Sequence, residues 1–228
     1  MIKKNIPNAI TLLNLFIGCS ALAYIFVGAA DAIVVTYFVL AALCCDFADG
    51  AVARALNVHS ELGKQLDSLA DMVSFGVVPG ALFFHLLYAG VAANFWLALP
   101  AFLVTVFSGL RLAVFNIDTR QSDVFIGLAT PASTTFVVGL YYLIQKYEWA
   151  RLANVYLYLI IAVLSLLLVA PVPMFSNKFK GSAWRGNEIR YAFMGIALVS
   201  LAIFQVATFA PLIILYICLS LIINILNK

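Results

Sequence analysis

The sequence predicts an all-α protein, a polytopic membrane helical bundle. Of its 228 residues, 65% are hydrophobic and only 10% are charged, which leaves too few polar side chains to cover a water-exposed surface. The hydrophobic residues recur in runs of about 17 to 25, the length that an α-helix needs to cross a bilayer. A membrane β-barrel would instead show segments of about ten residues with alternating hydrophobicity. Soluble, collagen-like and disordered classes are therefore excluded.

Loop signals divide the hydrophobic sequence into eight segments within a single integral membrane domain, 1–228. The connections at 28–31 and 89–93 are short, so the helices that they join should be antiparallel neighbours. The longest polar connection is 173–190, and the last two helices follow it. In chain order, the predicted helices are 11–27, 32–54, 62–88, 94–117, 130–146, 153–172, 190–206 and 209–226.

The basic residues predict how the chain lies in the membrane. With the N-terminus inside, only Lys146 and Arg151 of the 13 lysines and arginines fall outside. Because basic residues collect in cytoplasmic loops, we expect a multi-pass protein of the cytoplasmic membrane in this orientation, with 173–190 as a cytoplasmic loop.

Charge and cysteine content exclude two other kinds of site. The net charge of +3 is small and scattered, so we expect no nucleic-acid partner. The four cysteines lie inside hydrophobic runs and have no metal-ligand spacing to either histidine. We expect buried thiols, without a zinc site or a disulfide framework.

Four aspartates lie in or beside the second and third hydrophobic segments, where acidic side chains are costly. An ionised acid at the centre of a bilayer costs about 2.5–3.5 kcal/mol, so four uncompensated acids would cost roughly 10–14 kcal/mol. A cost of this size requires a compensating charge. The four acids are Asp46, Asp49, Asp67 and Asp71.

Helical periodicity places these acids on two polar stripes together with small residues. At about 100° per residue, each set falls on one face of its helix. The short cytoplasmic connection after Arg54 makes the two helices neighbours, so the stripes should meet near the inner surface. One stripe holds Asp46, Asp49, Gly50, Ala53 and Arg54, and the other holds Gly63, Asp67, Asp71 and Ser74.

Four carboxylates in one pocket predict two bound divalent cations, whose charge would balance theirs. Ligation by oxygen alone favours Mg²⁺, Mn²⁺ or Ca²⁺ over zinc. Such a pair of ions suits displacement at phosphorus, and Arg54 is placed to bind phosphate. Clustered membrane acids also coordinate ions in channels, so a divalent-cation transporter is the alternative from another class.

The stretch 46–71 reads D-x2-D-G-x2-A-R-x8-G-x3-D-x3-D and resembles the signature of the CDP-alcohol phosphotransferases. The resemblance implies a six-helix core at 1–172, two additional helices at 190–228, and a homodimer. It also implies a CDP-linked donor, two divalent metals on the four acids, and Asp71 as the general base.

Further candidate residues surround the acids. Asn8 and Thr11 lie three residues apart on the first segment and could reach phosphate or cytidine. Arg111, late in the fourth segment, and Asn116 are candidates for binding a serine carboxylate or the lipid phosphate. The full nucleotide- and phosphate-binding set is Asn8, Thr11, Asp49, Gly50, Ala53, Arg54 and Gly63.

The flanks of the motif are similar to those of membrane-embedded phosphatidylserine synthases. That similarity implies transfer of a phosphatidyl group from CDP-diacylglycerol to L-serine, giving phosphatidylserine and CMP. Val114 and Ala129 depart from the usual pattern, and transferases using glycerol phosphate or inositol phosphate remain alternatives. The similar stretches are 6–12, 66–79, 110–116 and 125–128.

Overall fold

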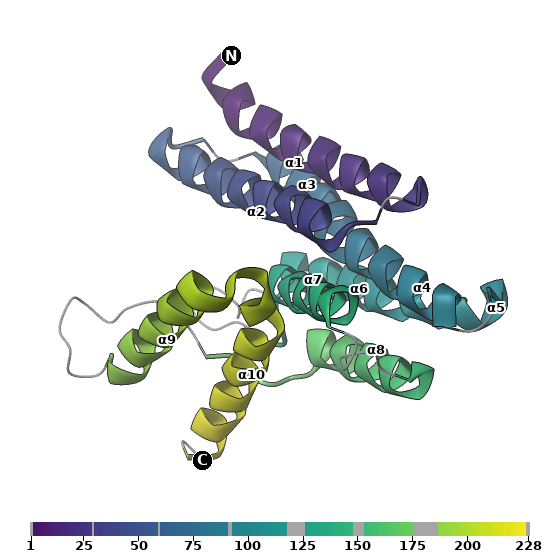
Figure 1. The fold of residues 1–228 in the computed structure, drawn as a ribbon. Helices are drawn as coiled ribbons and strands as arrows, with labels where there is room; N and C mark the ends of the chain where they lie inside the picture. Colours follow the sequence, from purple (N-terminus) through teal and green to yellow (C-terminus); the bar gives the residue numbers. More distant parts are fainter. Residues whose placement is uncertain are drawn as a thin grey trace.

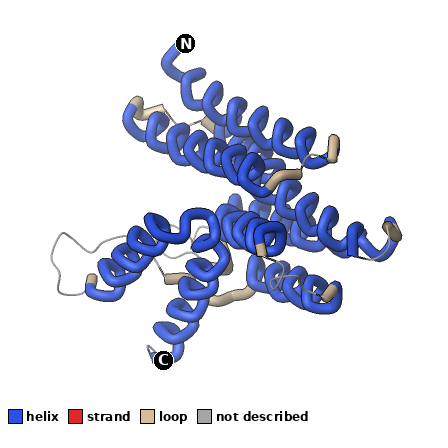
Figure 2. Tube along the Cα trace, in the orientation of Figure 1, coloured by secondary structure: helices blue, strands red, loops and turns tan. Residues whose placement is uncertain are grey.

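The computed structural model confirms the all-α class. It describes residues 2–28, 30–58, 60–90, 93–117, 126–147, 153–175 and 187–226. Within these ranges the regular structure is helical (Figure 2), and the one β-type contact is an isolated bridge between Ile126 and Pro173. Most of the expected loop 173–190 lies outside the described residues, and with it Lys178, Lys180 and Arg185.

The first three helices form one group (Figure 1). Helix α1 (Ile2–Phe26) packs along α2 (Ala32–Ala55) and against α3 (Glu61–Asp71). Asp31 caps α2 by accepting hydrogen bonds from the backbone N–H groups of the second and third helical residues, at 2.9 and 3.0 Å. Ser60 caps α3 by accepting from the Gly63 N–H at 3.0 Å. These caps satisfy N–H groups that the helix itself leaves unpaired.

Helix α3 continues through a π turn (Met72–Val77) into α4 (Val78–Gly90). The Val78 N–H donates to the Val73 carbonyl, an i to i−5 hydrogen bond. Pro79 explains the turn, because proline has no N–H to give to the carbonyl four residues earlier and its ring crowds that carbonyl. The helix widens here instead of breaking, so the third predicted helix is continuous but contains a change of register.

The remaining helices enclose the core. Helix α5 (Phe95–Ala98) passes through a 3-10 turn (Leu99–Phe102) into α6 (Leu103–Ile117), and α7 (Thr130–Lys146) and α8 (Asn154–Val169) follow. Side chains from α4, α6, α7 and α8 pack together in the interior. The fully buried members include Leu82, Phe83, Val104, Tyr141 and Leu168.

The C-terminal pair consists of α9 (Glu188–Phe204) and α10 (Phe209–Leu226), separated by a 3-10 turn (Gln205–Thr208). Gln205 has a φ of 50°, which interrupts the helix. Helix α10 packs against α7, and α9 extends away from the bundle (Figure 1). Two further helices therefore follow α8, and the division into a core at 1–172 and an addition remains a prediction.

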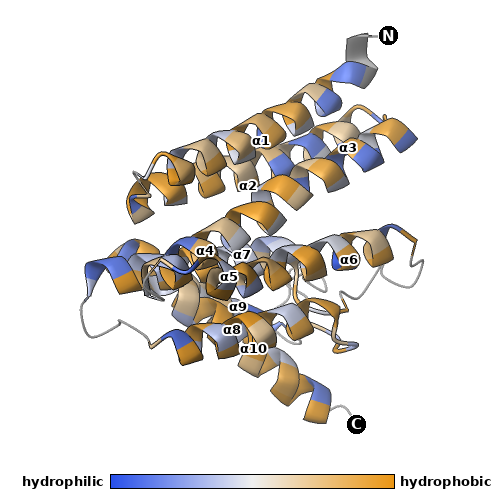
Figure 3. Ribbon diagram, turned by 90° about the vertical axis from the view of Figure 1, so that its right-hand side faces the viewer, coloured by the Kyte–Doolittle hydropathy of each residue, from blue (hydrophilic) through white to orange (hydrophobic). Residues whose placement is uncertain are grey.

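The outer surface is suited to lipid. In the part of the chain that the structure describes, five helical stretches are long and apolar enough to cross a membrane, while Asn154–Val169 is apolar but shorter. Large hydrophobic side chains such as Phe16, Phe47 and Leu166 are exposed, and hydrophobic residues cover much of the outside (Figure 3). The chain is a multi-pass membrane protein. The five stretches are Asn5–Phe26, Ala32–Ala55, Glu61–Gly90, Phe95–Ile117 and Glu188–Leu226.

The expected burial of the cysteines was wrong. Cys19, Cys44 and Cys218 are exposed and Cys45 is partly exposed, all as free thiols. In a membrane protein a hydrophobic run also faces lipid, so hydrophobic surroundings in the sequence do not require a place in the protein interior.

Candidate active site

Three aspartates from α2 and α3 converge on one point. Asp46, Asp49 and Asp67 each place one carboxylate oxygen within 4.8 Å of the others. Asp49 is buried, and Asp71 lies near enough to Asp46 for their carboxyl groups to share a hydrogen bond. Ionised carboxylates this close together repel one another unless a cation lies between them. A cluster of oxygen ligands at this spacing fits a hard divalent cation. The residues present therefore fit the metals that the motif implies.

Helix α1 contributes a direct contact to this cluster. The Thr11 hydroxyl lies 2.6 Å from Asp49 Oδ2, and it also lies 3.1 Å from the Pro7 carbonyl of its own helix. Thr11 is only 3% exposed. Its hydroxyl thus fixes the direction in which the Asp49 carboxylate points, an orienting role that is typical of residues behind metal ligands.

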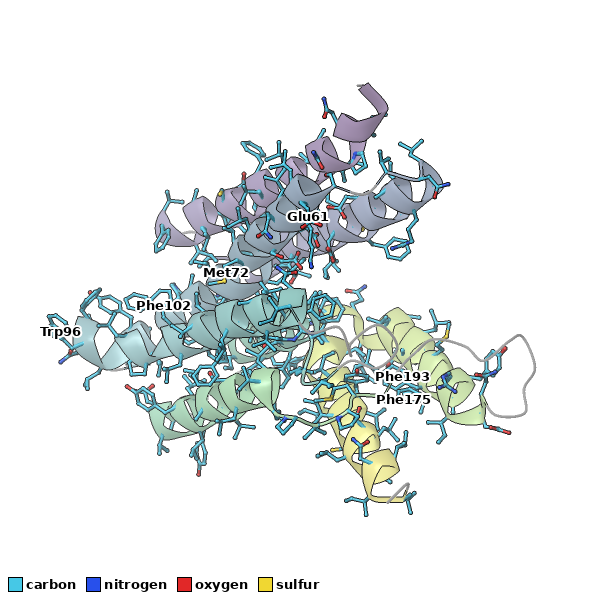
Figure 4. The ribbon with its side chains drawn as sticks, turned by 180° about the vertical axis from the view of Figure 1, so that it is seen from behind. Glu61, Met72, Trp96, Phe102, Phe175 and Phe193 are labelled. Carbon is cyan, nitrogen blue, oxygen red and sulfur yellow. The ribbon has the colours of Figure 1, made fainter. Side chains whose placement is uncertain are left out.

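A pocket of about 510 Å³ opens beside the cluster, lined by α1, α2, α3 and the connection between the last two. Figure 4 shows oxygen-bearing side chains gathered near Glu61 and above Met72, where α3 faces α2. A Cβ on Gly63 would lie 3.0 Å from Asn8 Oδ1, so the glycine permits the close approach of α1 and α3. Of the predicted residues, those that line the pocket are Asn8, Thr11, Asp49, Gly50, Ala53, Gly63 and Asp67.

The other predicted residues lie around this pocket. Arg54 is exposed and is not among the lining residues, although its Nη1 would lie 3.4 Å from a Cβ on Gly50. Arg111 is buried on α6, interacts electrostatically with Asp71, and leaves its Nε without a hydrogen-bond partner. The structure thus brings Arg111 to the acids and leaves Arg54 at the rim.

Asn116 hydrogen-bonds to residues of α3 and to none of the four acids. Its Nδ2 donates to Ser68 Oγ at 2.7 Å, and its backbone carbonyl accepts from Lys64 Nζ at 2.7 Å. These two bonds hold the end of α6 against α3. In the structure Asn116 therefore positions one helix on another.

Sequence reasoning missed several residues of the pocket. Lys64 lines it three residues before Asp67, a spacing that places both on one helix face and could have revealed it. Ser74, which the predicted stripe included, does not line the pocket; it donates to Asn14 Oδ1 at 2.8 Å, which joins the π turn to α1. The remaining lining residues that the motif did not indicate are Pro7, Val58, Ser60 and Glu61.

Comparison with known proteins places this site in a family. The model of the CDP-alcohol phosphatidyltransferase family matches residues 4–170, a range that includes every candidate residue. The chain belongs to this family. Helices α9 and α10 lie beyond the match.

Three similar proteins share the name CDP-diacylglycerol–serine O-phosphatidyltransferase. The protein from Helicobacter pylori strain J99 is 37% identical over 148 residues, which cover 63% of this chain and 60% of the relative. The protein from Saccharomyces cerevisiae is 40% identical over 120 residues, which cover 48% of this chain and 42% of the relative. The Mycobacterium leprae protein is 30% identical over 179 residues, which cover 74% of this chain and 57% of the relative. The chain thus spans less than two thirds of the length of these relatives.

Proposed function

We propose that this protein transfers the phosphatidyl group of CDP-diacylglycerol to L-serine, giving phosphatidylserine and CMP. The observation that carries the proposal is the cluster of carboxylate oxygens, all within 4.8 Å, beside a pocket of about 510 Å³. The pocket has the size of a small-molecule site, for which about 300–1,000 Å³ is usual. The similar proteins are serine O-phosphatidyltransferases by name, which favours serine as the acceptor.

The four aspartates would hold two divalent cations, Mg²⁺, Mn²⁺ or Ca²⁺. When bound, such ions neutralise phosphate charge and stabilise the CMP leaving group. The convergence of Asp46, Asp49 and Asp67 supports this assignment, and Asp71 stands next to Asp46. Thr11 would keep Asp49 in its ligating direction through their 2.6 Å contact.

The donor nucleotide would occupy the pocket between α1, α2 and α3. Gly50, Ala53 and Gly63 leave room for it to approach the helix backbones, and Asn8 offers an amide for hydrogen bonding. Arg54 at the rim would meet the phosphates as they enter. The acyl chains would remain in the bilayer, against the apolar outer surface.

The serine hydroxyl would attack the phosphorus of the phosphatidyl group. A bond forms from serine oxygen to phosphorus, the bond from phosphorus to the CMP oxygen breaks, and Asp71 takes the hydroxyl proton. Arg111, which interacts with Asp71, would bind the serine carboxylate or the lipid phosphate. Asn116 would contribute by holding α6 beside α3.

Topology and assembly complete the proposal. The basic residues favour a cytoplasmic N-terminus and an active site at the cytoplasmic face of the cell membrane, where nucleotide and serine arrive from water. The family resemblance supports a homodimer.

Release of CMP by the purified protein tests this function. With CDP-diacylglycerol and Mn²⁺ or Mg²⁺ present, adding L-serine should start CMP release and produce phosphatidylserine. In competition with a fixed donor, serine should outcompete glycerol phosphate and inositol phosphate, and preference for either of these would reject serine. Metal flux in liposomes without any CMP release would favour the transporter instead.

A further inference from the structure

The π turn directly follows the proposed general base. Asp71 is the last residue of α3, and the turn occupies Met72–Val77. An inserted residue rotates everything after it by about 100° relative to what precedes it. The acids before the turn can therefore face α2, while Val78 and Leu82 after it are completely buried in the core. The direction of Asp71 depends on how firmly this joint is held.

The turn contains one carbonyl, that of Phe75, whose regular helical donor is missing. In a regular helix the Phe75 carbonyl would accept from the N–H of residue 79, which is a proline and has none. A π turn also interrupts the regular ladder at the point where the α-helix resumes. Because buried carbonyls are costly to leave unpaired, a donor from another helix is favourable at this point of the segment.

Two threonines from two other helices supply those partners. Thr134 on α7 is completely buried, and its hydroxyl lies 2.9 Å from the Phe75 carbonyl and 3.0 Å from the Thr130 carbonyl of its own helix, so it donates to these two acceptors in a shared geometry. Thr105 on α6 donates to the Gly76 carbonyl at 2.8 Å. A Cβ on Gly80 would overlap Thr105 Oγ1, so the glycine makes room for this hydroxyl. The two hydrogen bonds connect consecutive residues of the π turn to two different helices, Phe75 to α7 and Gly76 to α6.

The same helices also meet the turn through neighbouring residues. A Cβ on Gly76 would lie 3.2 Å from the Ser108 Cβ on α6. Arg111, one helical turn further along α6, interacts with Asp71. Helix α6 thus contacts this segment twice, at Asp71 through Arg111 and at the π turn through Thr105. These two contacts couple the position of Asp71 to that of the turn.

We propose that Thr105 and Thr134 are positioning residues of the transfer reaction, which hold the π turn so that Asp71 meets the acceptor hydroxyl. Neither threonine touches the acids or the pocket; both act through the backbone that carries Asp71. The inference rests on the proposed function, since it takes Asp71 as the base.

The test compares substitutions that keep the shape and remove the hydroxyl with substitutions that keep the hydroxyl. In the purified full chain, Thr105→Val and Thr134→Val should each lower kcat about 10- to 100-fold, as expected when a catalytic group is displaced. KM for serine and for CDP-diacylglycerol should stay within about threefold of the parent, because the pocket is intact. Thr105→Ser and Thr134→Ser should restore kcat.

The control is Thr36→Val, since Thr36 is as buried as Thr134, and more buried than Thr105, but donates only to the Ala32 carbonyl of its own helix, at 2.6 Å. Its kcat should match the parent. If valine variants fail to fold, Thr105→Cys and Thr105→Ser replace them, because the thiol is a much weaker donor. A kcat in the valine variants equal to that of the parent, or equal rates in the serine and cysteine variants, would overturn the proposal.

A drop in kcat accompanied by an equal rise in KM would also overturn it, because that pattern indicates general damage to the site. The test stays separate from the proposed function. If the parent releases CMP with a different alcohol, serine is rejected as the acceptor and the same variants are compared with that alcohol.

Discussion

Replacing Thr11 by valine removes the hydroxyl that orients Asp49 while keeping the shape of the side chain. Thr11 is 3% exposed, so water does not replace the lost donor. A hydrogen bond to a charged group contributes about 1.5–3 kcal/mol, which corresponds to a factor of roughly 10 to 150. Because the Thr11–Asp49 contact is only 2.6 Å long, we expect the apparent affinity for the activating metal to decrease by a factor in this range.

The assay measures the initial rate of CMP release against Mn²⁺ or Mg²⁺ concentration, with both substrates saturating. The Thr11→Val curve should shift to higher metal concentration and approach the parent rate at saturation. Thr36→Val serves as the control, since its hydroxyl bonds only within its own helix. A Thr11→Val curve within twofold of the parent would show that the contact does not orient a metal ligand.

Three further changes test other parts of the structure. Asp71→Asn should lower turnover about 10²- to 10⁴-fold without loss of folded protein, and unchanged CMP release would reject Asp71 as the base. Gly18→Ala places a Cβ against Ser74, so the free energy of unfolding should fall by about 1–3 kcal/mol and the melting temperature should drop. Gly195→Ala is the control, since a Cβ there meets open space and the melting temperature should stay unchanged. Lys64→Met removes a side chain that lines the pocket and whose Nζ donates to the Asn116 carbonyl at 2.7 Å, so we expect KM for CDP-diacylglycerol to rise about tenfold as α6 loosens from α3 beside the pocket, and an unchanged KM would contradict this role.

The helices and the meeting of the acids could be predicted because both follow from local periodicity. Hydrophobic runs of membrane length become helices whatever they pack against. Asp46 and Asp49 share a face by their spacing, as do Asp67 and Asp71, and the short connection after α2 leaves little freedom for the second stripe. The acidic cluster could therefore be predicted from the single stretch 46–71.

Contacts between distant helices could not be predicted in this way. Pro79 signals a disturbed helix, but only the packed structure shows that Thr105 and Thr134 supply the missing donors. The same holds for Thr11, which could equally have faced a ligand, and for Asn116, which bonds to α3 instead of the acids. Each depends on how one helix is rotated against another, which one sequence does not specify.

Among the described residues, the pocket is lined by residues between 7 and 67, which come from the first three helices and the connection between α2 and α3. On the proposed function, recognition of the activated donor would therefore depend on one continuous part of the chain. Substitutions in α6, α7 and the later helices would then change how the acceptor approaches without replacing a residue that lines the donor pocket.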